Sequence, residues 1–345
     1  MLDLIKNSLR IPCALRRVQP ENLASVLPIP KMPRAGDIAL ARLESIGKNT
    51  RLELSSGRPC ALHVGDLLAV VFGNRYATMQ FEGYAGASGD ACDLLSMGGV
   101  CGLVESKHEK VQEPSRLRLL GAIGDAEGNP LRLRDFALPA TPLRASPRKV
   151  VVCGSAMDVG KTHTAVSLII GLRQQGCSVA AVKLTGTATG RDFWAMKDAG
   201  AHPIVDFVDG GFPSTYLCSL DDLLMLDQLL TAHAAALGAS WIVVEIADGL
   251  LQKETSTLLR SPRFTENIDA FVFACADPLA TVGGVELLRG WGIEPVAISG
   301  RLSMSPLVVR EASEGTGIPC LTATELQSGL LNERLLKTAS RASLS

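Results

Sequence analysis

Residues 149–164, with the sequence KVVVCGSAMDVGKTHT, constrain the fold of this chain more than any other stretch. The run opens with apolar β-forming residues, continues through small and acidic residues, and then enters a pattern typical of a helix. A strand, a glycine-containing loop and a helix in this order predict a phosphate-binding P-loop, because the N–H groups at a helix N-terminus attract anions. The predicted nucleotide-binding residues are Gly154, Ser155, Asp158, Val159, Gly160, Lys161, Thr162 and His163.

The Gly-Lys-Thr part of this motif supplies three different groups for phosphate binding. Gly160 lets the backbone approach the phosphates, Lys161 supplies a cation from an expected exposed junction of loop and helix, and the Thr162 hydroxyl can ligate Mg²⁺. The first glycine, Gly154, lies one residue earlier than the common spacing of the two glycines predicts. The alternative interpretation is a plain strand-to-helix turn that contains Gly-Lys-Thr by chance.

Composition narrows the class of protein. A chain of 345 residues is long enough for two domains, and its formal net charge of −1 argues against a nucleic-acid partner. The nine cysteines form no CxxC pair, so neither a zinc site nor a disulfide framework is indicated. No apolar run approaches the ~18 residues of a membrane span. We therefore expect a cytoplasmic protein without a membrane partner.

The distribution of glycine, proline and apolar runs divides the chain into five parts. Short β-rich runs separated by glycine turns predict a small β-barrel or sandwich, whereas alternating strand and helix patterns after the P-loop predict an α/β domain with a doubly wound, mostly parallel sheet. Short helices are expected near 3–9 and 21–26. The predicted parts are an N-terminal strap (1–33), the β domain (34–138), a linker (139–148), the P-loop α/β domain (149–335) and a tail (336–345).

Two further predicted strands end in charged residues. The strand 178–183 ends in Lys183, and the central strand 241–245 ends in Glu245. Because function gathers at the carboxyl ends of parallel strands, Thr162, Asp192 and Glu245 are the predicted Mg²⁺ ligands. The alternatives are a carboxylate at a solvated strand end, an exposed lysine, and an Asp192 that caps the following helix.

Two polar stretches, 209–216 and 247–255, follow predicted strands and match no general motif. The first presents three hydroxyl groups, and the second contains Asp248 and Glu254. If both emerge on the P-loop edge of the sheet, they line the pocket of an acceptor substrate, and Asp248 or Glu254 orients an amine and accepts its proton. The alternative is a pair of polar loops with helix-capping residues.

The segment from Gly154 to Thr162, with an acidic residue at 158 and Val159 before Gly-Lys-Thr, resembles the P-loop of dethiobiotin synthetase and its relatives. The resemblance covers roughly residues 149–300. It implies that Lys183 contacts phosphate and substrate, and that Asp192 and Glu245 bind Mg²⁺. The chain departs from the pattern because Lys183 is followed by leucine, not proline, and because Glu245 lies in Val-Glu-Ile-Ala-Asp-Gly without the glycine-rich continuation.

Two other groups of P-loop proteins are similar to this chain at a comparable level. One is a branch that includes acyltransferases acting on amino acids. The other is the molybdopterin-guanine dinucleotide accessory proteins, which share the P-loop and a related second strand. Because the loops after the strands differ from the synthetase pattern, we expect a different substrate.

These observations predict a Mg·ATP-dependent ligase that activates a carboxylate or carbamate by phosphoryl transfer before an amine attacks it. The expected cofactors are ATP and Mg²⁺, the partner is a small-molecule carboxylate or amine, and a homodimer is one option for assembly. The alternatives are an N-acyltransferase that uses acyl-CoA, and a nucleotide switch in cofactor biosynthesis. The predicted catalytic residues are Lys161, Lys183, Asp248 and Glu254.

Overall fold

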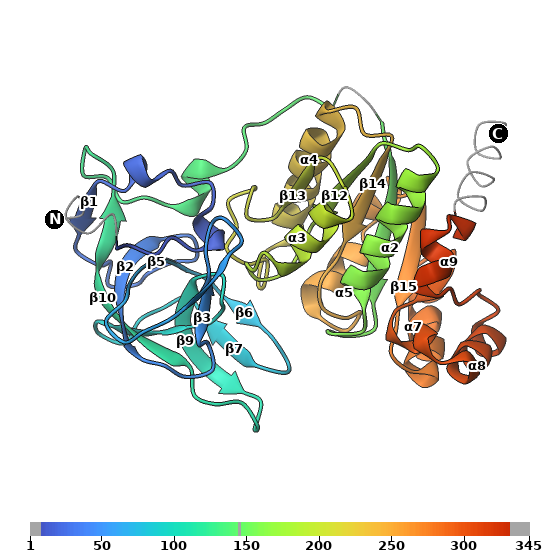
Figure 1. Cartoon of the computed structure of the whole chain (residues 1–345), viewed down its shortest axis with the longest axis horizontal. Coiled ribbons are helices and arrows are strands. Elements are labelled where there is room, and N and C mark those ends of the chain that lie inside the picture. The colour runs from blue at the N-terminus through green and yellow to red at the C-terminus, as the bar shows by residue number, and fades with distance from the viewer. Residues whose placement is uncertain (1–7, 144–145, 332–345) are drawn as a thin grey trace. The chain divides into compact units, whose positions relative to one another are not determined.

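The computed structural model describes residues 8–143 and 146–331. The chain forms two compact units (Figure 1). The barrel unit consists of Met1–Pro139, Gly186–Arg191 and Phe207–Leu217, and the P-loop unit consists of Ala140–Thr185, Asp192–Asp206 and Cys218–Ser345. The predicted boundaries of the strap, linker and tail stay predictions.

Five strands of the barrel unit close into a ring, in which each strand is hydrogen-bonded to two neighbours. Going around the ring, they are β10 (Ser115–Gly124), β2 (Ile38–Ser45), β5 (Leu67–Phe72), β9 (Val100–Lys107) and β8 (Ala91–Leu94). Alternate side chains of these strands, among them Phe72 and Leu117, fill the interior. The prediction of a small β-barrel or sandwich is confirmed, and the fold is a barrel.

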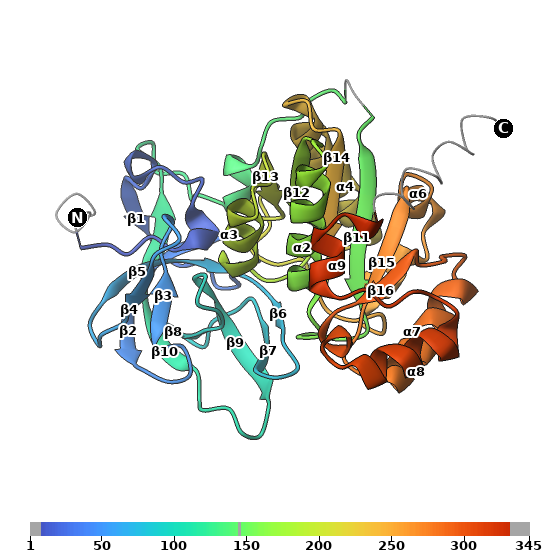
Figure 2. The same cartoon turned by 45° about the vertical axis from the view of Figure 1, so that its right-hand side comes forward.

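Shorter elements complete the barrel unit, and several are visible in Figure 2. The strand β1 pairs with β10, β7 pairs with β9, and β6 pairs with β7. These and the remaining elements are β1 (Ser25–Leu27), β6 (Arg75–Tyr76), β7 (Phe81–Tyr84), the hairpin β3 (Arg51–Glu53) with β4 (Pro59–Ala61), and the 3₁₀ turns η1 (Cys13–Leu15), η2 (Pro20–Asn22) and η3 (Leu133–Phe136).

The N-terminal segment differs from its prediction. The expected helix near 21–26 is wrong, because only the turn η2 forms there and the chain then enters β1, where Val26 lies opposite Ile123 of β10. Pairing with an open sheet edge satisfies these backbone groups better than one short isolated turn of helix could. Most of the helix expected near 3–9 lies outside the described residues.

The P-loop unit contains a six-stranded sheet in the order β13-β12-β14-β11-β15-β16, and all neighbouring pairs are parallel. This confirms the predicted α/β class. The P-loop strand β11 lies inside the sheet, between β14 and β15, so its loop emerges at the middle of the carboxyl edge. The strands are β11 (Arg148–Gly154), β12 (Val179–Lys183), β13 (Ile204–Asp206), β14 (Trp241–Glu245), β15 (Ala270–Ala274) and β16 (Ala297–Ser299).

Helices follow the strands in alternation. Two helices, α6 (Pro262–Thr265) and α9 (Ala323–Gln327), were not expected from the sequence. Helix α5 (Lys253–Leu259) begins inside the stretch 247–255, which was expected to be a loop. The side chain of Gln252 is the N-cap of α5, because it accepts a hydrogen bond from the Thr255 amide. The helices are α2 (Lys161–Gln174), α3 (Arg191–Asp198), α4 (Leu220–Ala236), α5 (Lys253–Leu259), α6 (Pro262–Thr265), α7 (Pro278–Gly290), α8 (Pro306–Thr316) and α9 (Ala323–Gln327), with the 3₁₀ turn η4 (Arg301–Met304).

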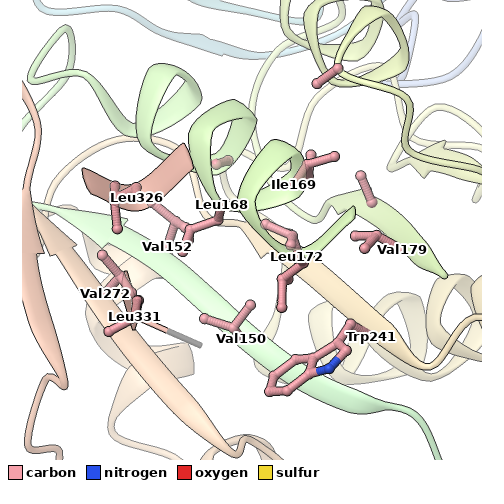
Figure 3. Packing of buried hydrophobic residues seen from close by; sticks show 14 of the residues in the cluster. Val150, Val152, Leu168, Ile169, Leu172, Val179, Trp241, Val272, Leu326 and Leu331 are labelled. Carbon is pink, nitrogen blue, oxygen red and sulfur yellow. The ribbon is translucent and has the colours of Figure 1, made fainter. Parts of the chain in front are cut away.

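The core of this unit fixes α2 on the sheet. Leu168, Ile169 and Leu172 of α2 pack on the apolar side chains of β11, β12 and β14, and Leu326 of α9 joins the same cluster beside α2 (Figure 3). Since α2 begins at Lys161, this packing also fixes the helix N-terminus at the end of β11. The P-loop is therefore held by a rigid helix rather than by its own contacts alone.

Two adjacent glycines of α7 provide a matched test of this packing. A Cβ atom added to Gly284 would lie 2.3 Å from the ring of the fully buried Phe273 in β15, whereas nothing lies within 4 Å of the position at Gly283. We expect Gly283→Ala to stabilise the protein by about 0.5–1 kcal/mol through helix propensity, and Gly284→Ala to destabilise it by about 1–3 kcal/mol through overpacking.

Chemical unfolding of the two variants, measured beside the wild type, tests this pair. Equal effects of the two substitutions would show that α7 does not pack on β15 as described.

Candidate functional site

The P-loop backbone adopts conformations that its two glycines make possible. Gly154 ends β11, and an added Cβ there would lie 2.9 Å from the carbonyl oxygen of Ala274. Gly160 has a φ of 98°, in the left-handed region that favours glycine, and the backbone of Gly300 and Arg301 packs directly against it. The amide of Ser155 donates to Ala274 at 3.0 Å. The loop is thereby fixed at both of its ends.

The loop leads into α2, whose first N–H groups have no acceptor within the helix and are available to an anion. Within this segment Val159 is buried, whereas the side chains of Asp158 and His163 are exposed. Asp158 has a φ of 58°, a conformation that aspartate tolerates better than most residues. The expected role of Asp158 and His163 in nucleotide binding stays a prediction.

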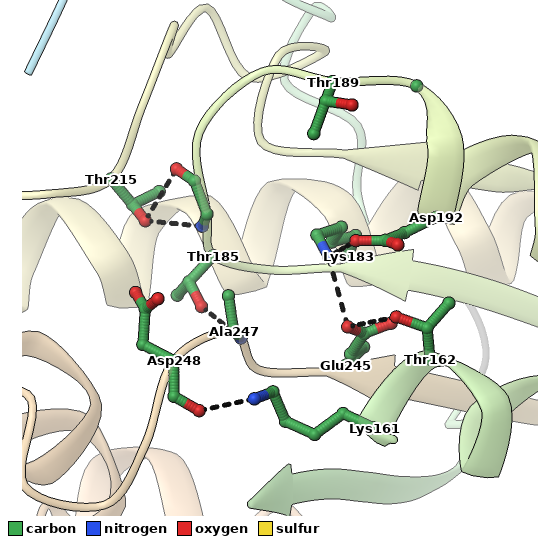
Figure 4. A network of polar contacts seen from close by, with 12 residues as sticks. Lys161, Thr162, Lys183, Thr185, Thr189, Asp192, Thr215, Glu245, Ala247 and Asp248 are labelled. Carbon is green, nitrogen blue, oxygen red and sulfur yellow. Dashed lines mark hydrogen bonds and ion pairs between the residues drawn. The ribbon is translucent and has the colours of Figure 1, made fainter. Parts of the chain in front are cut away.

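Lys161 is buried, with 7% of its surface exposed, and not at an exposed junction as expected. Its Nζ atom donates to the carbonyl oxygens of Ala156 and Asp248, each at 2.6 Å, and Figure 4 shows the bond to Asp248. Burial lowers the pKa of Lys161, although the nearby carboxylates of Glu245 and Asp248 act in the opposite direction. The ammonium group thus lies between the P-loop and the segment after β14, with only uncharged acceptors.

Three strand ends bring the other predicted residues together. Lys183 and Glu245 lie opposite each other in the pairing of β12 with β14, and Glu245 lies opposite Val152 of the P-loop strand. Glu245 Oε1 accepts hydrogen bonds from the Thr162 hydroxyl at 3.0 Å and from Lys183 Nζ at 3.1 Å. Lys183 also forms an ion pair with Asp192, close to the start of α3.

Two of the three charged side chains of this cluster are buried, and Asp192 is half-buried. Lys183 and Glu245 have 5% and 2% of their surfaces exposed. Burial alone would lower the pKa of Lys183, but the carboxylates of Asp192 and Glu245 outweigh it and raise the pKa well above its usual range. The second carboxylate oxygen of Glu245, Oε2, is buried and has no hydrogen-bond partner among the described residues. An unsatisfied buried carboxylate oxygen is costly, so this atom is a candidate ligand for a cation.

The donor set at this point fits Mg²⁺. The ion prefers oxygen ligands, and neighbouring corners of its octahedron lie about 3 Å apart, given metal–oxygen distances of about 2.1 Å. The 3.0 Å separation of Thr162 Oγ1 from Glu245 Oε1 matches this spacing. Asp192 is held by Lys183 close by. No group of three or more His, Cys, Asp or Glu residues suited to a metal ion occurs among the residues that the structure describes.

Asp248 and Glu254 lie after β14, but in different settings. The backbone of Asp248 has a φ of 61°, its carbonyl oxygen accepts from Lys161, and its side chain points away from that lysine (Figure 4). Burial raises the pKa of its carboxyl group to about 6, against the influence of Lys161 and Lys183. Glu254 is buried and accepts a hydrogen bond from the side-chain amide of Gln252, whose oxygen caps α5. One hydrogen bond of Glu254 therefore stabilises the local structure at the start of α5.

Two of the three hydroxyl groups of the stretch 209–216 are buried and hydrogen-bonded within the barrel unit, and the expected role of this stretch in a substrate pocket stays a prediction. Ser214 and Thr215 are buried in the barrel unit. Thr215 Oγ1 accepts from the Gly186 amide at 2.9 Å, and Ser214 Oγ accepts from the Tyr216 amide at 3.2 Å. Sequence patterns did not reveal the partner of Thr215, because the Gly186 amide lies 29 residues away along the chain, whereas the bond of Ser214 is local.

Two groups that the sequence analysis missed support the site. The Arg301 amide donates to Val159 at 2.8 Å, so the turn after β16 holds the outer side of the P-loop. Thr185 Oγ1 accepts from the Ala247 amide at 2.8 Å and joins the segments after β12 and β14. The sequence clue to both residues was their position just after a strand. Every loop on this edge of the sheet has the same position, so the clue does not single them out.

In the described part of the chain, no helix is long and apolar enough to cross a membrane. The central β11 strand, the loop that follows it and the parallel sheet give the P-loop unit a P-loop NTPase fold.

Comparison with known proteins gave structural similarity alone. No protein family model matches the chain. No curated protein matches it. Solved structures with similarity include the signal recognition particle 54 kDa protein from Aeropyrum pernix in complex with GDP (18% identity, TM-score 0.39). The alignment covers 61% of this chain and 52% of that protein, so the chain matches about half of its length.

The signal recognition particle receptor FtsY from Elizabethkingia anophelis is also similar, in two structures. One has 17% identity and a TM-score of 0.37, with 55% of this chain and 67% of the receptor covered. The other, in complex with GDP, has 14% identity and a TM-score of 0.38, with 55% and 66% covered.

Proposed function

We propose that the protein is a Mg·ATP-dependent enzyme that transfers a phosphoryl group to a carboxylate or carbamate, as a ligase similar to dethiobiotin synthetases does. The observation that carries the proposal is the cluster of Thr162, Asp192 and the buried Glu245 and Lys183 at the carboxyl edge of the P-loop sheet. A purely structural ion pair would not need a threonine hydroxyl from the P-loop helix and an unsatisfied carboxylate oxygen at the same point.

Several residues of the chain have separate roles in the proposed phosphoryl transfer. Lys161 and the first amides of α2 bind the outer phosphates of ATP. Thr162 and Glu245, with Asp192 nearby, hold Mg²⁺, which neutralises phosphate charge when bound. Lys183 is a second buried cation, on the strand next to Glu245, and stabilises the charge of the transferring group. Phosphoryl transfer depends mainly on such positioning and electrostatics.

Product analysis with purified protein tests the reaction class. A ligase consumes one ATP for each bond formed between the activated carboxylate and an amine. Product that depends on acyl-CoA and not on ATP would instead identify an acyltransferase, and slow hydrolysis stimulated by a protein partner would identify a nucleotide switch.

Lys161→Ala should abolish measurable binding of Mg·ATP, with an affinity loss of about 100-fold or more, because it removes a charged donor to the phosphates. Isothermal titration calorimetry gives the affinity. Lys253→Ala removes an exposed lysine at the start of α5 and is the matched control. Because Lys161 is buried, the unfolding transition must be recorded for both variants; a folded Lys161→Ala protein with unchanged affinity contradicts the assignment of the phosphate site.

Glu245→Gln should lower turnover by about 100-fold or more and raise the Mg²⁺ concentration needed for half-maximal activity, while ATP affinity changes little. The amide keeps the shape of the side chain and an acceptor oxygen, but it is a poor Mg²⁺ ligand. Turnover measured as a function of Mg²⁺ concentration gives both quantities, with Glu314→Gln on the exposed side of α8 as the control. An unaltered Mg²⁺ dependence would remove Glu245 from the metal site.

Asp248 links the site to pH, because its carboxyl group has a pKa raised to about 6 by burial. A base must be deprotonated, so turnover should rise as pH passes through about 6, and Asp248→Asn should lower turnover and remove this rise. The folded state favours the protonated acid. The contribution of this carboxyl group to folding stability is therefore fully present below a pH near 4, the pKa in the unfolded state. It is lost as the pH rises through about 6, the pKa in the folded state.

Asp248→Asn should consequently be more stable than the wild type at pH 8, by up to about 2 kcal/mol, and the difference should shrink toward pH 4. Asparagine also tolerates the left-handed backbone at this position. Urea unfolding at the two pH values measures the difference; a gap that does not change with pH would show that Asp248 does not titrate in this range.

A further inference from the structure

All three tyrosines of the chain lie together in the barrel unit. They are Tyr76 of β6, Tyr84 of β7, and Tyr216, which belongs to the segment Phe207–Leu217 of the same unit. The ring centroid of Tyr216 lies 5.5 Å from that of Tyr76 and 6.2 Å from that of Tyr84. The three residues are half-buried, so the aromatic cluster is part of the surface. The proposed phosphoryl transfer makes no use of it.

A carboxylate lies on the same face of the sheet as these rings. The strands β6, β7 and β9 lie side by side (Figure 2), and Glu82 of β7 is opposite Tyr76 in β6 and Ser106 in β9. Tyr84 follows Glu82 by two residues in the same strand. Residues that are directly opposite, or two apart in one strand, project from one face of a sheet. Glu82 therefore lies among the tyrosines, and Tyr216 packs beside them.

Glu82 is ionised and has no cation beside it. Its Oε1 atom accepts a hydrogen bond from the Tyr84 hydroxyl and its Oε2 atom accepts one from the Ser106 hydroxyl, each at 2.6 Å. These hydrogen bonds lower the pKa of Glu82, because they stabilise the charged form. Within the described residues no lysine, arginine or histidine forms an ion pair with Glu82. The basic residue next to Ser106 in β9, Lys107, pairs with Glu113 instead.

The third ring is held in place by bonds to its backbone. The Tyr216 amide donates to Ser214 Oγ at 3.2 Å, and the Tyr216 carbonyl oxygen accepts from the Asn74 side chain at 3.3 Å. Asn74 also accepts from the Ala85 amide at 2.9 Å, so one side chain joins the Tyr216 segment to the end of β7. A site whose parts are fixed in advance binds with a smaller loss of conformational entropy.

We propose that Tyr76, Tyr84, Tyr216 and Glu82 form a binding site for the alkylammonium group of a small molecule. Such a group is attracted to the faces of aromatic rings and also forms an ion pair with a carboxylate. A neutral group of the same shape gains neither interaction, and Glu82 repels an anion. The site is independent of the proposed reaction, because all of its residues belong to the barrel unit.

Fluorine NMR spectroscopy tests the site on the full-length protein with 3-fluorotyrosine in place of tyrosine. The signals report on this cluster alone, because the chain contains no tyrosine besides these three. Choline is the probe, and 3,3-dimethylbutan-1-ol, in which carbon replaces the nitrogen, is its neutral counterpart. Choline should shift the signals in a saturable way, with an affinity at least about 10-fold higher than that of the alcohol. Sodium chloride at matched concentration corrects for ionic strength.

Equal responses to choline and the alcohol would overturn the proposal, because they would show a merely apolar surface. The absence of any choline-dependent shift up to about 50 mM would overturn it as well.

Four variants test the individual contributions, and an unfolding transition is recorded for each. Glu82→Gln and Tyr84→Leu should each weaken choline binding by about 10-fold, because one removes the charge and the other the ring. Tyr84→Phe keeps the ring and should stay within about 3-fold of the wild type. Glu127→Gln, which removes a carboxylate from an exposed turn of the same unit, is the control. Unchanged affinity in folded Glu82→Gln, or an equal loss in Glu127→Gln, would contradict the site.

Discussion

The carboxyl edge of the P-loop sheet depends on one buried cation, Lys183, and the two carboxylates that meet it. Glu245 and Asp192 come from different parts of the chain, and the buried Glu245 has Lys183 as its ion-pair partner. Removing one member of such a cluster leaves an uncompensated charge, which is far more destabilising than the net worth of the cluster. The need to keep these charges paired constrains both the register of β12 against β14 and the residue at which α3 begins.

The same cluster explains why the P-loop helix and the neighbouring strands form one functional edge. Glu245 accepts from Thr162 with the oxygen that also meets Lys183, so the first turn of α2 is joined to the ends of β12 and β14. The remaining Glu245 oxygen has no partner among the described residues. One carboxylate oxygen of the cluster is therefore left unsatisfied, and under the proposed function this atom is a ligand for Mg²⁺.

The sequence predicts the elements that rest on local chemistry. Gly-Lys-Thr after a β-rich run identifies the P-loop, and Lys183 and Glu245 are found because parallel strands bring their carboxyl ends together. Contacts between distant backbone groups leave no such trace. Thr215 accepts from the Gly186 amide, 29 residues away, and Lys161, which was expected to be exposed, is buried and donates to the carbonyl oxygen of Asp248, 87 residues away. Glu53 has no motif around it at all, since its partner is a main-chain amide 137 residues away.

Lys161 connects the phosphate site to the segment that carries Asp248. Its two acceptors are uncharged carbonyl oxygens, one from the P-loop and one from Asp248 itself. Phosphate oxygens are stronger acceptors for an ammonium group than carbonyl oxygens are. Under the proposed function, a nucleotide that binds Lys161 competes directly with the hydrogen bond to Asp248. Occupation of the phosphate site and the position of the Asp248 carboxyl group are therefore coupled through a single lysine.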